Sequence, residues 1–334
     1  MTVAEQKKRL SEIDAAKGLA IILVVIGHLV MREQPLGNEW YKQLRASIYA
    51  FHMPFFMYLG GFVMFYTRAA FVKKEVYFDF LKKRAYRLLV PFFFMAFVIF
   101  FGKTGASLFI SVDNTPKEFW NGLLAIFWNT HDSPAISLWY IFVAFIYALI
   151  IPPALWLLKD RILPLLAAAA ILYALPLPEY MYLDKIGQYF VFFVLGGYIA
   201  TQFEKYQTML DQWKWLAWLA FATSLSITFL DWNWAITMAI VGTLSIPAIH
   251  ALVRIPKLAN SQILLFFGQY SFVIYLFNTI MIGLAKGVMF KFMTWHGVNF
   301  LVFVPVLLSA GLIAPILLKK IVFKQIPVID KLTM

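Results

Sequence analysis

The sequence predicts an all-α, polytopic integral membrane protein with about ten transmembrane helices. Hydrophobic residues make up 62% of its 334 residues and charged residues only 14%. A soluble domain is closer to half apolar and a quarter charged. Mean hydropathy is +0.76, and many Trp and Tyr residues stand near the ends of apolar runs, where aromatic side chains anchor membrane helices. This composition excludes an ordinary soluble protein.

Ten apolar runs follow one another along the chain, and most have the length of about 20 residues that crosses a bilayer. The runs 88–102 and 161–176 are shorter, but their apolar neighbours leave them little water to face. The loop 103–137 contains a further stretch typical of a short amphipathic helix. We predict one membrane domain over residues 1–334, with helices at 12–31, 46–66, 88–102, 138–158, 161–176, 187–203, 213–230, 234–253, 263–283 and 300–319.

The distribution of basic residues predicts that both chain ends lie in the cytoplasm. With this orientation, 21 of the 29 Lys and Arg residues fall on the cytoplasmic side and 8 outside, whereas the acidic residues divide almost evenly. The net charge of +12 therefore reflects the positive-inside rule rather than binding to nucleic acid. Lys7, Lys8 and Arg9 precede the first apolar run, and no small-residue cleavage site follows it, as expected for a retained signal anchor.

Cysteine is absent from the chain, which excludes disulfides, thiolate metal sites and a cysteine nucleophile. The sequence also lacks the G-x-S-x-G, P-loop and G-x-G-x-x-G patterns. Any chemistry must therefore come from other polar groups within or beside the helices.

The ionisable residues of the first helix include Asp14, Lys17 and His28. Lys17 and His28 fall on nearly the same helix face, about three turns apart. Ionisable side chains inside a membrane are costly and usually line a path or a site. Structural alternatives remain open: Asp14 has the spacing of a helix-capping partner for Ser11, and Lys17 could reach the interface beside Asp14. His28 could be a hydrogen-bonded structural histidine.

His52 strengthens the functional interpretation of His28. The second helix runs back from the outer surface, so His52 lies at a depth similar to that of His28. Pro54 follows within the same helix and leaves backbone groups open nearby. Two histidines at matching depth on sequential helices form a candidate acid–base or binding site. No third ligand accompanies them, so we predict no metal site.

Arg84 and Arg87 are a separate candidate in the cytoplasmic segment before the third helix. Their i, i+3 spacing places both guanidinium groups on one helix face, where forked donors suit phosphate groups. A role in setting topology and contacting anionic lipid is equally compatible with the pattern.

Further polar or small residues are candidates for supporting roles. Gly61 permits a close approach of another backbone or a ligand, with helix packing as the simpler interpretation. Four other residues have side chains suited to hydrogen bonding between helices: Trp139, Tyr140, Tyr275 and Asn278.

Five segments, in this order, resemble acyltransferase family 3, and in particular its fucose 4-O-acetylase-like branch. They cover nearly the whole chain and read IDAAKGLAIILVVIGH, FHMPFFMYLGGF, RAYRLLVPF, FFVLGGYIA and GQYSFVIYLFN. The resemblance implies a membrane domain of roughly ten helices that transfers acyl groups, usually acetyl from cytosolic acetyl-CoA, to sugars of extracytoplasmic glycans.

The resemblance also implies roles for individual residues. Lys17 and His28 match the family's basic residue–histidine motif, in which the histidine is catalytic, and His52 matches the histidine of its FHMP motif. Arg84 and Arg87 match its R-x-x-R motif, associated with acyl-CoA. Two positions depart from the family: Gly60 stands where many members have Ser, and Asn278 where many have His.

These observations together predict a bacterial multi-pass enzyme of the cytoplasmic membrane. We expect it to move an acyl group, most simply acetyl, from cytosolic acyl-CoA to a hydroxyl of a glycan or lipid-linked sugar outside the cytoplasm. His28 would act as general base, aided by His52, Lys17 would hold a phosphate or the pantetheine end of the donor, and Arg84 and Arg87 would bind acyl-CoA. No tightly bound cofactor is expected. The alternatives are a glycan or lipid transporter and a catalytically idle partner of a glycan-synthesis complex.

Overall fold

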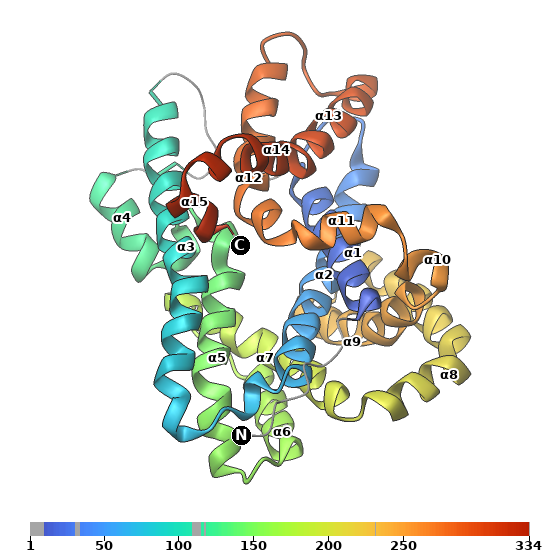
Figure 1. Ribbon diagram of the computed structural model, residues 1–334. Coiled ribbons are helices and arrows are strands. Elements are labelled where there is room, and N and C mark those ends of the chain that lie inside the picture. Colours follow the sequence, from blue (N-terminus) through green and yellow to red (C-terminus); the bar gives the residue numbers. More distant parts are fainter. Residues whose placement is uncertain (1–9, 31–33, 109–114, 117, 231, 334) are drawn as a thin grey trace.

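The computed structural model describes residues 10–30, 34–108, 115–116, 118–230 and 232–333. Helices form all of its regular structure, and no β-strand occurs in these ranges (Figure 1), so the predicted all-α class is confirmed. The longer helices are α1 (Ser11–His28), α2 (Glu39–Tyr66), α3 (Tyr77–Ala106), α5 (Trp139–Leu157), α6 (Ile162–Ala174), α7 (Leu183–Thr201), α8 (Phe203–Ser224), α9 (Trp234–Val253), α12 (Ser271–Met289) and α13 (Phe300–Leu312).

Shorter helices and 3₁₀ turns connect the long elements. The five short α-helices are α4 (Phe119–Phe127), α10 (Pro256–Ala259), α11 (Gln262–Gln269), α14 (Ala314–Ile321) and α15 (Pro327–Leu332). The helix α4 lies within the expected amphipathic stretch of loop 103–137. Lys7, Lys8 and Arg9, and residue 31 of the first expected helix, lie outside the described residues.

Three of the predicted helices begin earlier in the structure and two are interrupted. The runs 46–66 and 88–102 are the apolar parts of α2 and α3, whose polar first turns extend beyond them. The run 213–230 corresponds to α8, which already begins at Phe203 with polar turns and ends at Ser224. The run 263–283 divides into α11 and α12 at Tyr270. The run 300–319 divides at Ile313, two residues before Pro315, because a proline cannot donate the backbone hydrogen bond that would continue the helix.

Six helical segments within the described ranges are long and apolar enough to cross a membrane, as expected for a multi-pass membrane protein. The pair α7 and α8, which is bent by 98°, raises this number to seven if it forms one span. The count of ten spans stays a prediction: it would need α7 and α8 as two separate spans, together with α6, which has only 13 residues, and α1, which carries three charged residues.

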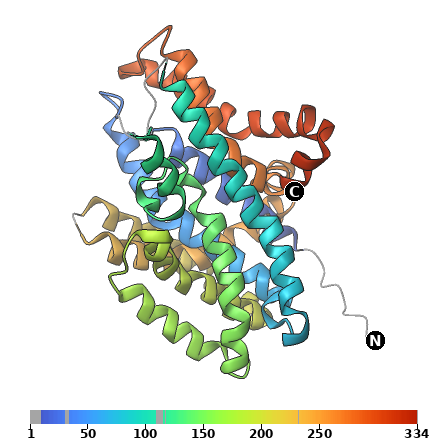
Figure 2. The same cartoon turned by 90° about the vertical axis from the view of Figure 1, so that its left-hand side faces the viewer.

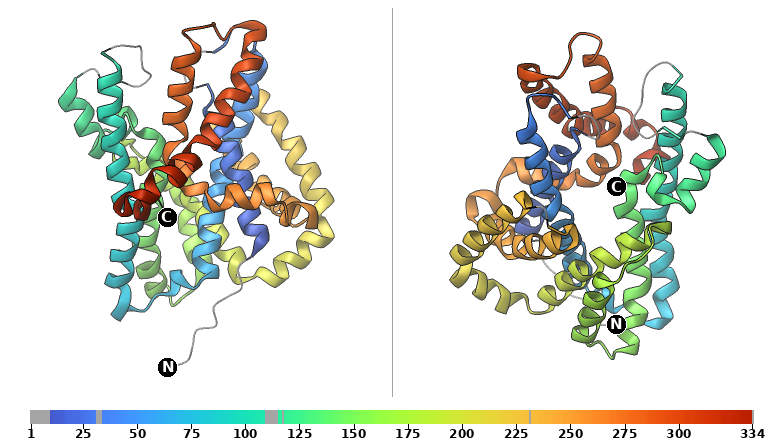
Figure 3. Two further views of the ribbon diagram at one scale, coloured as in Figure 1. Left: turned by 45° about the horizontal axis from the view of Figure 1, so that its top comes forward. Right: turned by 180° about the vertical axis from the view of Figure 1, so that it is seen from behind.

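The central position of α1 is the feature that organises the site. This helix contacts α2, α9, α11 and α12, and Figure 3 shows it enclosed by other helices. It crosses α11 at very short range, because Gly18 lies against the backbone of Leu264 and Gly268 lies against the backbone of Asp14. Larger side chains at the two glycines would keep the helices apart.

The helices α2 and α7 form the most extensive pairing in the fold. Gly61 of α2 faces the carbonyl of Phe193, and Gly196 of α7 faces the carbonyl of Tyr58, so neither position has room for a β-carbon. This close contact fixes the second half of α2, which continues from the segment that carries Tyr49 and His52.

The helices α3 and α5 run side by side at one edge of the molecule (Figure 2). The α4 helix packs beside α3, and α15, close to the C-terminus, also touches α3 (Figure 1). Much of the surface of α3 remains exposed, as expected for a helix that faces lipid.

Replacement of Gly61 by Ala tests the close α2–α7 contact. The added methyl group would overlap the Phe193 carbonyl, so we expect Gly61→Ala to destabilise the fold by about 1–3 kcal/mol, a typical cost of overpacking. Thermal unfolding of the detergent-purified protein measures this loss. The matched control is Gly283→Ala on α12, where the new methyl group meets nothing within 4 Å; it should leave the unfolding midpoint unchanged or raise it slightly. Equal midpoints for the two variants would contradict the packing described.

Candidate functional site

The two histidines singled out in the sequence converge in the structure. His28 is the last residue of α1, and His52 lies in the middle of α2. The ring of Tyr49 neighbours both imidazoles, with centroid separations of 6.3 Å to His28 and 4.9 Å to His52. The Tyr49 hydroxyl donates to the carbonyl of Gly27 over 3.3 Å, which links the end of α1 to α2.

Each imidazole has one ring nitrogen within hydrogen-bonding distance of a partner. Nδ1 of His52 lies 2.8 Å from the carbonyl oxygen of Ile48. A carbonyl can only accept, so Nδ1 of His52 carries the proton and donates. Nδ1 of His28 lies 3.3 Å from Oδ1 of Asn278 on α12. Three helices, α1, α2 and α12, therefore meet around the two rings.

A cavity of about 480 Å³ opens beside this pair, a size usual for small-molecule sites. Both histidines line it, together with Tyr49 and with residues of α5, α6, α7, α9 and α12. Aromatic rings form much of the wall, contributed by Trp139, Tyr173, Tyr189, Trp234 and Tyr275.

Trp139 and Tyr275 are sequence-predicted residues that the structure places in this wall. The Trp139 ring packs on Tyr189, with 4.6 Å between ring centroids. The Tyr275 hydroxyl donates to the carbonyl of Ser137 over 2.6 Å and accepts from the backbone N–H of Tyr140 over 3.2 Å. Tyr275 therefore ties α12 to the start of α5.

Tyr140 and Asn278 lie directly behind the wall. The Tyr140 ring packs edge-on against those of Tyr275 and Phe56, but Tyr140 does not line the cavity. Asn278 is almost completely buried, at 1% exposure. Gly61 lies in the α2–α7 contact, away from the cavity lining.

The cavity has a polar side, formed by the α6–α7 connection and the beginning of α7. Glu179, Asp184, Lys185 and Gln188 line it, and Asp184 forms an ion pair with Lys185 at 2.9 Å. A lining that combines aromatic rings with hydrogen-bonding groups suits a polar organic ring.

Lys17 and Asp14 lie apart from this cavity. Nζ of Lys17 is 3.3 Å from a carboxylate oxygen of Asp14, one helical turn away, and neither residue lines the cavity. The N-cap residue of α1, Leu10, makes no side-chain hydrogen bond, and Asp14 forms an ion pair with Lys17. Lys17 and His28 are separated by 11 residues of helix, a rise of about 16 Å.

Arg84 and Arg87 lie on α3, which does not contribute to the cavity. The guanidinium group of Arg84 sits over the ring of Phe80, at 5.2 Å from its centroid. Within the described ranges, no carboxylate forms an ion pair with either arginine. Both guanidinium groups therefore keep donors for another partner.

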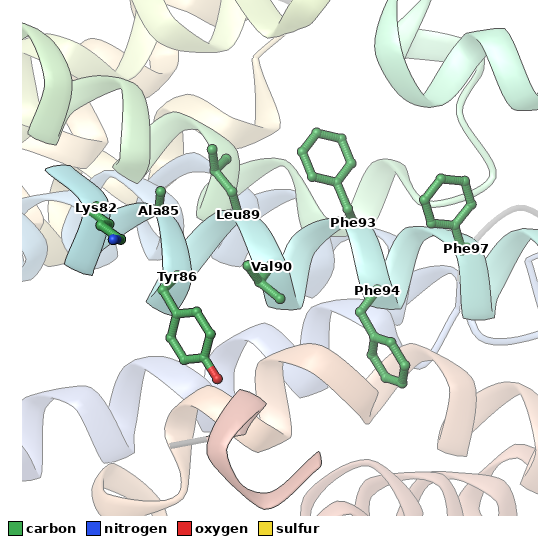
Figure 4. Close-up of a pocket in the computed structure, with 8 residues that line it drawn as sticks. All are labelled: Lys82, Ala85, Tyr86, Leu89, Val90, Phe93, Phe94 and Phe97. Carbon is green, nitrogen blue, oxygen red and sulfur yellow. The ribbon is translucent and has the colours of Figure 1, made fainter. Parts of the chain in front are cut away.

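A second concave region follows the exposed face of α3, and Figure 4 shows its side chains. All eight lining residues belong to this one helix, and only Lys82 and Tyr86 among them carry polar side-chain atoms. Phe93 and Phe97 lie on the side where α4 packs, with the Phe93 ring stacked on Phe127. An apolar trough on a lipid-facing helix indicates contact with acyl chains rather than a reaction site.

Tyr49 and Arg45 were not singled out from the sequence. The guanidinium group of Arg45 lies over the Tyr49 ring, at 5.0 Å from its centroid. Arg45, Tyr49 and His52 are spaced four and three residues apart, a pattern that places them on one helix face and could have identified them. The residues of the α6–α7 connection carry no comparable local signal, because only the folding of distant helices brings them to the histidines.

A metal centre finds no support in the described part of the chain, where no three His, Cys, Asp or Glu side chains cluster suitably. The combination of two imidazoles, an aromatic wall and a polar side instead favours acid–base chemistry on an organic substrate.

Comparison with known proteins adds a family assignment. A family model described as an acyltransferase domain matches residues 10–320. The chain is 25% identical over 227 residues to nodulation protein NolL of Mesorhizobium japonicum, and 29% identical over 226 residues to NolL of Sinorhizobium fredii. Each alignment covers 66% of this chain, but only 56% and 57% of the respective relatives, so the chain spans little more than half their length. No solved structure matches significantly.

Proposed function

Because this chain belongs to acyltransferase family 3, we propose that it transfers an acyl group, most simply acetyl, from cytosolic acyl-CoA to a hydroxyl group of an extracytoplasmic glycan or lipid-linked sugar. The observation that carries this proposal is the pair of imidazoles, His28 and His52, on the wall of one cavity. The cytoplasmic membrane of a bacterium is the proposed location.

His28 is the proposed general base. Its imidazole takes the proton of the acceptor hydroxyl as the oxygen attacks the thioester carbonyl carbon. The carbon–sulfur bond then breaks, and the departing thiolate recovers the proton from His28. No cysteine exists to form an acyl-enzyme, which favours direct transfer or a transient acyl-histidine. His52, with Nδ1 committed to the Ile48 carbonyl, offers Nε2 as a second acceptor for the same hydroxyl.

The cavity wall supports a sugar as the acceptor. Aromatic side chains such as Trp139 and Tyr189 contribute apolar ring surface to the wall, and Asp184, Lys185 and Gln188 in the same lining offer hydrogen bonds. These polar residues belong to the α6–α7 region, which the positive-inside rule assigns to the outer surface.

The donor is proposed to enter from the opposite, cytoplasmic side. Arg84 and Arg87 provide forked donors for the phosphates of acyl-CoA. Lys17 lies on α1 between the cytoplasmic start of this helix and His28 at its end. The long pantetheine arm of the donor would then carry the thioester along α1 towards the histidine.

Substitution of His28 tests the proposed base. Loss of a general base typically costs 10²–10⁴-fold in rate, so we expect His28→Ala to lower the transfer rate at least about 100-fold. The measurement follows radiolabelled acetyl from acetyl-CoA into surface glycan, with purified protein in lipid nanodiscs. The control is His296→Ala, whose exposed side chain lies outside the cavity and should leave the rate unchanged. Full activity of His28→Ala would refute the mechanism, and no transfer by the unsubstituted protein would favour a transporter.

The arginine pair is tested by comparing two donors. Charge-assisted hydrogen bonds contribute about 1.5–3 kcal/mol each, so Arg84→Gln and Arg87→Gln should each raise the KM for acetyl-CoA about tenfold or more. The KM for S-acetylpantetheine, which lacks the nucleotide phosphates, should stay constant. Lys83→Gln, an exposed neighbour on the same helix, is the control. An equal rise for both donors would show that the arginines act through the fold and not on phosphate.

Single cysteines test the orientation of the cavity, since the chain contains none of its own. Glu179→Cys, at an exposed position that lines the cavity, should react with a membrane-impermeant maleimide on intact cells. Lys83→Cys should react only after the membrane is permeabilised, because the positive-inside rule places it in the cytoplasm. Gel-shift or mass analysis reads the labelling. The reverse pattern would overturn the proposed topology and with it the external acceptor.

A further inference from the structure

The side-chain amide of Asn278 has a fixed orientation. Its Nδ2 lies 2.9 Å from the carbonyl oxygen of Ile274 and 2.9 Å from that of Tyr275. Carbonyl oxygens only accept, so these two positions require the NH₂ group of the amide and exclude its oxygen. Both amide hydrogens are thereby used within α12, and Oδ1 is the atom that remains for His28.

The oxygen of Asn278 determines which nitrogen of a neutral His28 carries the proton. Oδ1 lies 3.3 Å from Nδ1 of His28 and has no hydrogen to give. A favourable contact therefore needs the proton on Nδ1, which leaves the lone pair on Nε2. No hydrogen bond to Nε2 of His28 occurs among the described residues, and the ring lines the cavity. The free nitrogen is therefore the one available to a substrate.

His52 is held in the same Nδ1-protonated tautomer by a different hydrogen-bond partner. Its Nδ1 donates to the Ile48 carbonyl one turn earlier in α2, so its own helix fixes the tautomer. His28 ends α1 and uses a side chain 250 residues away in the sequence. Both rings on the cavity wall thus have Nδ1 occupied and Nε2 unprotonated.

We propose that Asn278 is a positioning residue that holds neutral His28 in its Nδ1-protonated tautomer and so directs the basic Nε2 to the acceptor hydroxyl. The consequence for rate rests on the proposed function of His28 as general base. An amide suits this task because it accepts a hydrogen bond without taking up the proton, so the proton that Nε2 gains stays available for the leaving thiolate.

The tautomer can be observed without measuring activity. We would incorporate ¹⁵N-histidine into the full chain in nanodiscs and record the chemical shifts of the two ring nitrogens of His28. The signals that disappear in the spectrum of His28→Ala identify this residue. The chain has only five histidines, which makes this assignment practical. We expect the Nδ1–H form in the unsubstituted protein, and a mixture or the Nε2–H form in Asn278→Leu. His52 serves as an internal control and should keep the Nδ1–H form in both.

Kinetics then separate positioning from simple loss of structure. Removal of the hydrogen-bond partner that orients a metal-ligating histidine typically costs about 10–100-fold. We expect a similar factor here, so Asn278→Leu should lower kcat about 10–100-fold with little change in the KM for acetyl-CoA. Asn278→Asp keeps an oxygen acceptor for Nδ1 of His28, but it places a second oxygen against the Ile274 and Tyr275 carbonyls and adds a charge that favours imidazolium. It should therefore keep the proton on Nδ1 without restoring the rate. Unfolding midpoints check that the variants fold.

The outcomes distinguish the inference from the function on which it rests. A Nε2–H signal for His28 in the unsubstituted protein, which needs no variant to fold, would overturn the inference. An unchanged His28 tautomer in folded Asn278→Leu would also overturn it, even with His28 essential. Conversely, the expected NMR result together with full activity of His28→Ala would support the tautomer assignment but refute the proposed base.

Discussion

The meeting of three helices at His28 is the constraint on which the site depends. The imidazole ends α1, touches the Tyr49 ring of α2 and reaches Asn278 of α12. Such an arrangement needs α1 in the middle of the bundle, and the glycine contacts with α11 allow it to sit there. The tight α2–α7 packing holds the continuation of the helix that carries His52. The glycines thus affect the site indirectly, because they allow the helices that carry the histidines to pack closely against their neighbours.

The positions of the helices could be predicted from the sequence better than the contacts between them. Hydrophobic runs located every long helix, because burial in lipid or protein demands apolar residues throughout a span. Runs end where polarity begins, so the basic first turns of α3 were missed although they are helical. The proximity of His28 and His52 followed from equal depth on sequential helices. The contributions of Tyr189 and Asn278 could not be derived in this way, because no local pattern reports which faces of distant helices meet.

The candidate residues fall into two groups that the fold keeps apart. His28, His52, Trp139 and Tyr275 line one cavity, whereas Arg84 and Arg87 lie on α3 at the edge of the molecule. A substrate that used both groups would have to be long, with its phosphates far from its reacting atom. An acyl-CoA, with its long and flexible pantetheine arm, has this shape, whereas a compact acyl donor does not.

The protonation of the site follows from the cost of charge at membrane depth. An unpaired charge there is expensive, and the Asp184 and Lys185 side chains that line the cavity form an ion pair. The two imidazoles instead have neutral partners, a backbone carbonyl and a carboxamide. A carboxylate in place of Asn278 would stabilise imidazolium and weaken the base, and an apolar residue would leave Nδ1 without an acceptor. An amide meets both requirements, which gives a physical reason for Asn at this position in a site that needs a neutral base.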